Sequence, residues 1–360
     1  MLKKDILAKT NDIWCGLNKP EIGIQGADLT VFGIPYDSES VIRTGTAKAP
    51  SVLRDASKIS APFNENFESF KQLNIYDAGD FVADKVITNG VITDSASEKA
   101  AERDAQKKIA QTKSTDCTCD HIVAGCAENG VLSEEQLEEY FEDISAFVKK
   151  LVRNDKFFIM IGGDHTATIP VLTGIDQAME EDFGIIYIGA HFDLHDTVDG
   201  QKYTPGTVAR RAFKLENISG PDNICFIGTR TIDEEENQYR TDNNIKYLNS
   251  VLCHRIESDR IGTIAAKQLK QFKKVYITLD IDALDPAYAA GVCYPQFAGL
   301  YGRQLLNIIS ELFKSLNVIG MDIVGMAPDL DPSLASTFAA RKIFQEVCGH
   351  CAKKLGKLSE

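Results

Sequence analysis

Imidazole and carboxylate side chains follow three apolar stretches of this sequence. The stretches 157–161, 184–188 and 275–278 have the largely continuous apolar pattern of strands buried on both faces of a parallel sheet. Open α/β sheets bind their ligands just beyond the carboxyl ends of such strands, so the residues that follow are candidates for a functional site. These polar residues are Asp164, His165, His191, Asp193, His195, Asp196, Asp280 and Asp282.

The chemistry of this set points to a divalent metal ion. Oxygen and imidazole donors without a thiolate suit Mn²⁺, Zn²⁺, Ni²⁺ or Fe²⁺. Carboxylates packed at one edge of a sheet also repel one another unless a cation or a proton lies between them. The alternative is a structural cluster, in which the carboxyl groups are protonated or accept hydrogen bonds from backbone amides.

The rest of the chain predicts the scaffold that would position these residues. Strand-like and helix-like segments alternate along it, and this order predicts right-handed crossovers. We therefore expect an α/β fold, a three-layer α/β/α sandwich with a central, mainly parallel sheet. A capping-box pattern at 133–136 predicts the start of a helix that runs to about residue 154. Four other acids are expected to bind strand-end amides and turns, namely Asp77, Asp80, Asp285 and Asp322.

Length and composition favour one large domain. The chain has 360 residues, 44% of them hydrophobic, and the strand motifs span most of it, so we expect a single domain over residues 1–360. Residues 82–132 interrupt this pattern and are expected to form a surface insertion. The net charge of −13 argues against nucleic acid and anionic membrane as partners. No apolar run approaches the ~20 residues of a membrane span, and we expect a cytoplasmic protein.

The cysteines are nine in number and scattered, which is typical of a reducing compartment. Cys348 and Cys351 have the spacing of a redox motif, but they lie inside a helical pattern rather than at a strand-to-helix junction. A group in the predicted insertion could in principle bind zinc, but its spacing matches no standard zinc motif, and we interpret it as part of a loop. Its members are Cys117, Cys119, His121 and Cys126.

The three polar motifs together resemble those of a known family. Residues 162–165 read Gly-Gly-Asp-His, residues 189–193 read Gly-Ala-His-Phe-Asp, and residues 280–286 read Asp-Ile-Asp-Ala-Leu-Asp-Pro. In this order they resemble the ureohydrolase superfamily of arginases, agmatinases and formimidoylglutamases. The resemblance runs from about Ala27 to about Gln345. It implies a homo-oligomer, a trimer or a hexamer, that acts on a small guanidino or formimino compound.

The resemblance also implies a metal centre. Members of the family use two Mn²⁺ ions to activate a water molecule for attack on an amidine carbon. Matched motif by motif, one ion would be bound by His165, Asp193 and Asp280. The other would be bound by His191, Asp280 and Asp282. The implied cofactor is Mn²⁺ or another divalent metal, reduced to one ion or none if the centre is incomplete.

Three family positions hold residues without the family's functional group. Gly189 stands where a second bridging carboxylate is expected, Pro205 where many members have a proton-transferring histidine, and Gly325 where a glutamate binds the substrate. Proline cannot exchange a proton, and glycine offers no charge-assisted bond to a guanidinium group. His195 and Asp196 are either solvated loop residues or side chains that reach inward to replace the missing ligand.

These substitutions predict a ureohydrolase-family protein with a degraded dimetal site, and not an efficient arginase or agmatinase. Two alternatives stay open. One is a metal-dependent hydrolase that cleaves C–N bonds of a linear amidine through a remodelled site, for example with a single ion. The other is a non-catalytic scaffold that binds a ligand or an oligomer partner.

Overall fold

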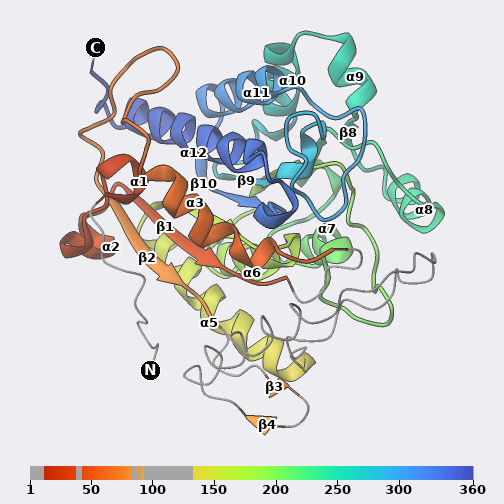
Figure 1. The fold of residues 1–360 in the computed structure, drawn as a ribbon. Helices are drawn as coiled ribbons and strands as arrows, with labels where there is room; N and C mark the ends of the chain where they lie inside the picture. Colours follow the sequence, from red (N-terminus) through yellow and green to blue (C-terminus); the bar gives the residue numbers. More distant parts are fainter. Residues whose placement is uncertain (1–11, 38–42, 83–86, 89–90, 93–132, 360) are drawn as a thin grey trace, which may run out of the picture. The chain divides into compact units, whose positions relative to one another are not determined.

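The computed structural model describes residues 12–37, 43–82, 87–88, 91–92 and 133–359 of the chain (Figure 1). The chain divides into two compact units. The larger comprises Met1–Phe81 and Asp143–Glu360, and the smaller is Val82–Glu142. Most of the predicted insertion, including its cysteines and His121, lies outside the described residues. The expected single domain over the whole chain stays a prediction.

A sheet of eight strands forms the framework of the larger unit. In chain order the strands are β1 (Leu29–Ile34), β2 (Ile75–Asp80), β5 (Phe157–Gly162), β6 (Gly184–Ile188), β7 (Ile224–Ile227), β8 (Tyr247–Leu248), β9 (Val275–Asp280) and β10 (Val318–Val324). Their spatial order is β2-β1-β5-β10-β9-β6-β7-β8, and every neighbouring pair is parallel. The motif-bearing strands β5, β6 and β9 are almost entirely buried, as the apolar runs predict.

Helices cover both faces of this sheet (Figure 1), which confirms the predicted three-layer sandwich. The α-helices are α1 (Ile13–Gly16), α2 (Gly23–Gly26), α3 (Ala49–Ser57), α5 (Glu134–Arg153), α6 (Thr168–Asp176), α7 (Val208–Ala212), α8 (Glu234–Asp242), α9 (Ser250–Arg255), α10 (Ser258–Leu269), α11 (Gly302–Ser315) and α12 (Ala335–Lys354). Short 3₁₀ turns lie at Pro20–Ile22, Thr46–Lys48, His165–Ala167, Pro205–Thr207, Pro221–Asn223, Ile281–Ala283 and Pro328–Leu330. Within the described part of the chain, no helix is both long and apolar enough to cross a membrane.

Successive side chains of a strand point to opposite faces of the sheet, so they pack into different layers. On one face, Val31 and Ile159 belong to a single buried cluster with residues of α1, α3, α10, α11 and α12. On the other face, the ring of Phe32 lies 5.2 Å from the ring of Phe147 in α5. On this second face, the hydroxyl of Thr168, the first residue of α6, donates to Asp322 in the central strand β10. Both layers therefore exclude water from the strands that lead to the candidate site.

The smaller unit contains a short antiparallel pair and the start of α5. β3 (Ile87–Thr88) pairs with β4 (Val91–Ile92). The N–H of Gln136 donates to Ser133 Oγ at 3.2 Å, and the N–H of Ser133 donates to Gln136 Oε1 at 3.0 Å. This reciprocal pair is the predicted capping box, and α5 ends close to the expected residue.

Cys348 and Cys351 lie buried within α12, inside a helix as predicted. Burial raises the pKa of both thiols. A redox motif works through a thiolate with a lowered pKa, so this environment does not favour redox chemistry at the pair.

Candidate functional site

The five predicted donors line one cavity at the carboxyl edge of the sheet. β5 and β9 each lead into a 3₁₀ turn there, and β10 lies between them, while β6 pairs with the other side of β9. The cavity has a volume of about 430 Å³. Its wall includes His165, His191, Asp193, Asp280 and Asp282. The structure thus brings the predicted residues together, and their binding of a metal ion stays a prediction.

His165 is oriented by a chain of hydrogen bonds from the centre of the sheet. Thr278 Oγ1 donates to Asp322 Oδ1 at 2.8 Å, so it accepts the bond from His165 Nε2, which is 2.9 Å away. The ring therefore carries a proton on Nε2 and turns Nδ1 toward the cavity. Nδ1 lies 3.2 Å from Asp193 Oδ2 and 3.4 Å from Asp280 Oδ2.

Removing the hydroxyl of Thr278 should destabilise the protein without changing the shape of the side chain. In Thr278→Val, both His165 Nε2 and one oxygen of the buried Asp322 lose a partner, and we expect the free energy of unfolding to fall by about 1–3 kcal/mol. Denaturant unfolding measures this loss. Thr278→Ser is the control, because it keeps the hydroxyl and loses one methyl group, about 0.8 kcal/mol. A valine variant no less stable than the serine variant would contradict the proposed bonding.

Asp322 and Asp285 are structural, as the sequence predicts. Asp322 is fully buried and accepts hydrogen bonds from the hydroxyls of Thr168, Tyr276 and Thr278 and from the N–H of Leu279. Asp285 accepts from the backbone N–H groups of residues 287 and 299. Neither acid lines the cavity.

Tyr187 is a residue of the site that the sequence reading missed. Its hydroxyl donates to Asp193 Oδ2 at 2.5 Å and lies 3.3 Å from His165 Nδ1. Its ring stacks on the His165 ring, with centroids 4.8 Å apart. Asp193 reaches this position with a φ of +53°, which is rare for a residue other than glycine. A tyrosine inside an apolar strand was the available signal, because a buried phenol usually finds a hydrogen-bond partner.

His191 and Asp282 form a second pair in the cavity wall. His191 Nδ1 lies 2.7 Å from Asp282 Oδ2, and Asp282 Oδ1 accepts the N–H of Ala190 at 2.8 Å. The His191 ring stacks on Tyr294, with centroids 5.3 Å apart. His191 Nε2 is buried and has no hydrogen-bond partner among the described residues.

The neighbours of these acids and imidazoles shift their pKa values. Burial and the charge of Asp282 raise the pKa of Asp280 well above its ordinary value. Burial acts in the same direction on Asp282, but His191 outweighs it and lowers the pKa of that acid. Burial disfavours the charged forms of His165 and His191, yet Asp193 and Asp282, respectively, raise their pKa values to about 9. The neighbouring acids thus favour the charged forms of the two imidazoles.

The three positions that depart from the family pattern also lie in this wall or beside it. A Cβ on Gly189 would lie 3.6 Å from Asp280 Cβ and 3.7 Å from Asp282 Oδ1, which are ordinary van der Waals contacts. Gly325 has a φ of +78°, and a Cβ there would collide with the carboxylate of Asp280. Pro205 starts the 3₁₀ turn Pro205–Thr207 and faces the cavity.

The contacts of the five donors bear on the implied pair of metal ions. The hydroxyl of Tyr187 is bonded to Asp193, and His191 is paired directly with Asp282. No carboxylate extends from Gly189 to bridge two ions. The binding of one or two ions by these residues stays a prediction.

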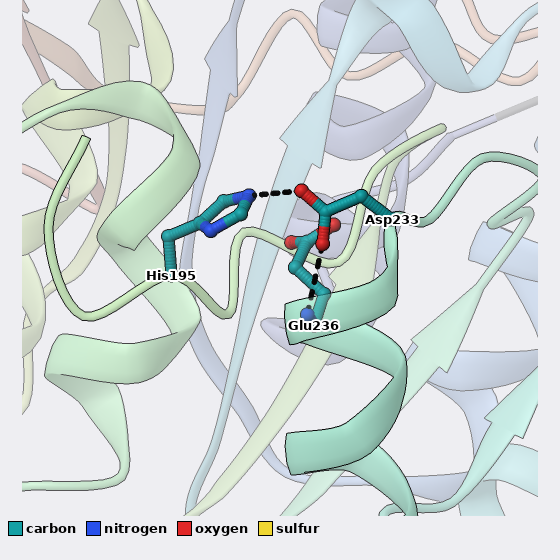
Figure 2. Close-up of side chains that lie close together, drawn as sticks. All are labelled: His195, Asp233 and Glu236. Atoms are coloured by element: carbon teal, nitrogen blue, oxygen red, sulfur yellow. Dashed lines mark hydrogen bonds and ion pairs between the residues drawn. The ribbon is translucent and has the colours of Figure 1, made fainter. Parts of the chain in front are cut away.

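A second group of donors lies in the same cavity wall (Figure 2). His195, Asp233 and Glu236 each have a donor atom within 4.8 Å of the others. His195 Nε2 lies 3.0 Å from Asp233 Oδ2, and its Nδ1 lies 3.6 Å from Glu235 Oε2. Sequence reasoning named His195 and missed the two acids. The available signal was the acidic start of α8, shortly after the end of β7.

Asp196 is oriented differently from its neighbour His195. Its carboxylate forms ion pairs with Arg211 and Lys214, and half of its side chain is exposed. Of the two interpretations offered for this residue, the solvated loop residue is the one that the structure supports. Asp196 is also absent from the residues that line the cavity.

Comparison with known proteins finds relatives over most of the chain. The pattern of the arginase family matches residues 27–349. An agmatinase from Halalkalibacterium halodurans is 33% identical over 207 residues, which are 57% of this chain and 68% of that protein. An agmatinase from Escherichia coli is 29% identical over 338 residues, which are 92% of this chain and 90% of that protein.

Solved structures agree with this result at the level of the fold. The agmatine ureohydrolase of Thermoplasma volcanium superposes with a TM-score of 0.70 at 23% identity, over 93% of each chain. Together with the sequence matches, this likeness confirms the resemblance inferred from the three polar motifs.

Proposed function

Because this chain belongs to the arginase family, we propose that its cavity binds a small guanidino or formimino compound and that it hydrolyses arginine and agmatine slowly or not at all. The first part rests on family membership and on relatives named for agmatine. The second part rests on Gly189, because a centre without its bridging carboxylate holds two dications less firmly.

The charges of the cavity support a cationic ligand. The acids of its wall outnumber the imidazoles of His165, His191 and His195. These acids are Asp164, Asp193, Asp233, Glu236, Asp280 and Asp282. An amidine or guanidinium group is a planar cation that forms charge-assisted bonds with such acids. Apolar side chains of Ile232, Val292 and Tyr294 in the same wall would contact the remainder of a small molecule.

Turnover is the measurement that tests this proposal. With arginine or agmatine and added Mn²⁺, we expect urea release well below about 1 per second, the lower end of ordinary enzyme rates. Binding of agmatine is measured separately by calorimetry, so that weak turnover is distinguished from the absence of a site. Urea release at roughly 1–10³ per second would overturn the proposal.

A remodelled hydrolase is the second candidate function. The group formed by His195, Asp233 and Glu236 favours it, because it supplies other donors within the same cavity. A panel of formimino and guanidino compounds, assayed for ammonia and urea, separates this function from a scaffold that binds without turnover. Assembly into a homo-oligomer stays a prediction.

A further inference from the structure

We propose that His195, Asp233 and Glu236 form a binding site for one divalent transition-metal ion. This inference does not depend on the proposed function, because it concerns donors outside the five residues matched to the family's metal centre. The side chains come from two segments, since His195 lies in the loop after β6 and the two acids lie at the start of α8 (Figure 2).

The spacing of the donor atoms suits a single ion. All three lie within 4.8 Å of one another, and His195 Nε2 is 3.0 Å from Asp233 Oδ2. Imidazole and carboxylate ligands bind at about 2.0–2.2 Å, so ligands of one ion are about 3–4 Å apart. Closing the group around an ion requires only small side-chain movements. One imidazole with two carboxylates suits Zn²⁺, Mn²⁺, Fe²⁺ or Co²⁺.

Backbone hydrogen bonds hold both acids in place. Asp233 Oδ1 accepts the N–H of Glu236 at 2.9 Å, which caps α8 and leaves Oδ2 directed at His195. Glu236 Oε1 accepts the N–H of Leu194 at 2.9 Å. One oxygen of each acid is thus fixed and the other is left for a cation. Such outer contacts orient ligands in known metal sites. The Leu194 bond also ties α8 to the loop that carries His195.

Among the residues that the structure describes, no lysine or arginine balances the charge of the group. Within the described residues, no such side chain forms an ion pair with Asp233, Glu235 or Glu236. Glu236 is 93% buried, since its exposed fraction is 7%, and within the described part of the chain its carboxylate accepts a hydrogen bond from a backbone amide. A buried carboxylate without a cation is costly, and a metal ion in contact with it would remove that cost.

Binding of Co²⁺ tests the site without relying on activity. The full-length chain, freed of metal with a chelator, is titrated with Co²⁺ and followed by visible absorption, with metal analysis after dialysis. Asp233→Asn and Glu236→Gln each keep the oxygen that accepts the backbone bond and lose the charge. We expect each to weaken Co²⁺ binding at least about tenfold.

Two variants serve as controls. Glu234→Gln makes the same change of charge in the same turn of α8, at a residue outside the group, and should bind Co²⁺ as the wild type does. Asp280→Asn should also bind Co²⁺ at this site, because Asp280 belongs to the five residues matched to the family's metal centre. The proposal is overturned if the wild type binds no Co²⁺. It is equally overturned if Asp280→Asn abolishes binding while Asp233→Asn does not, or if Glu234→Gln weakens binding as much as Asp233→Asn.

Discussion

Gly189→Asp should make the free energy of unfolding rise with the concentration of Mn²⁺. The substitution is made together with Asp233→Asn, which removes the other proposed metal site. A Cβ at Gly189 does not collide with its neighbours, because it would make ordinary contacts at 3.6 Å with Asp280 and 3.7 Å with Asp282. The new carboxylate would complete a set of oxygen and imidazole donors around a cation. A metal that binds the folded state alone stabilises it by about 2.7 kcal/mol at 100 times its Kd.

Without metal, Gly189→Asp should lower the free energy of unfolding. It places another carboxylate beside the buried Asp280 and Asp282, and like charges in one site repel. Melting temperature with and without Mn²⁺ measures both effects. Gly189→Asn is the matched control, because it has the same size without the charge. If aspartate and asparagine respond equally to Mn²⁺, or neither responds, then Gly189 is not what limits metal binding.

Replacing Arg54 should destabilise the fold by about 3–5 kcal/mol, because it leaves buried acids without their cation. Arg54 in α3 is 3% exposed and forms ion pairs with two acids of β2. Its Nε lies 2.6 Å from Asp77 Oδ2, and its Nη1 lies 2.7 Å from Asp80 Oδ1. Burial raises the pKa of Asp80 even with Arg54 beside it. These acids were expected to bind backbone amides, and the structure shows that their main partner is this arginine.

The Arg54 prediction is measured by denaturant unfolding of Arg54→Met. Fluorescence follows the transition, because the single tryptophan, Trp14, donates its indole N–H to Asp77 at 2.7 Å. Lys273→Met is the control, since Lys273 and Glu181 form an exposed ion pair whose loss should cost at most about 1 kcal/mol. If Arg54→Met lowers the free energy of unfolding no more than Lys273→Met does, the prediction is contradicted.

The framework of this protein was predictable because its signals are local. Continuous apolar runs at 157–161, 184–188 and 275–278 indicate strands buried on both faces, and the structure has β5, β6 and β9 there. Parallel strands present their carboxyl ends at one edge, so the convergence of His165, His191 and Asp282 also followed from the pattern.

The order of the strands and the partners of the side chains were decided by tertiary structure. β10 lies between β5 and β9 although it follows both in sequence, and it places Asp322 next to Thr278. No local pattern encodes such a pairing, because it depends on which crossovers pack against the sheet. The orientation of His165 follows from this long-range contact.

The sequence by itself therefore determined the fold class, the edge that carries the polar residues, and the absence of a carboxylate at Gly189. Tertiary structure alone directed the Tyr187 hydroxyl to Asp193 and brought Asp233 and Glu236 to His195. The residue types determine which chemical groups the side chains offer. Their partners depend on distances between segments that are remote in the chain, and packing sets those distances.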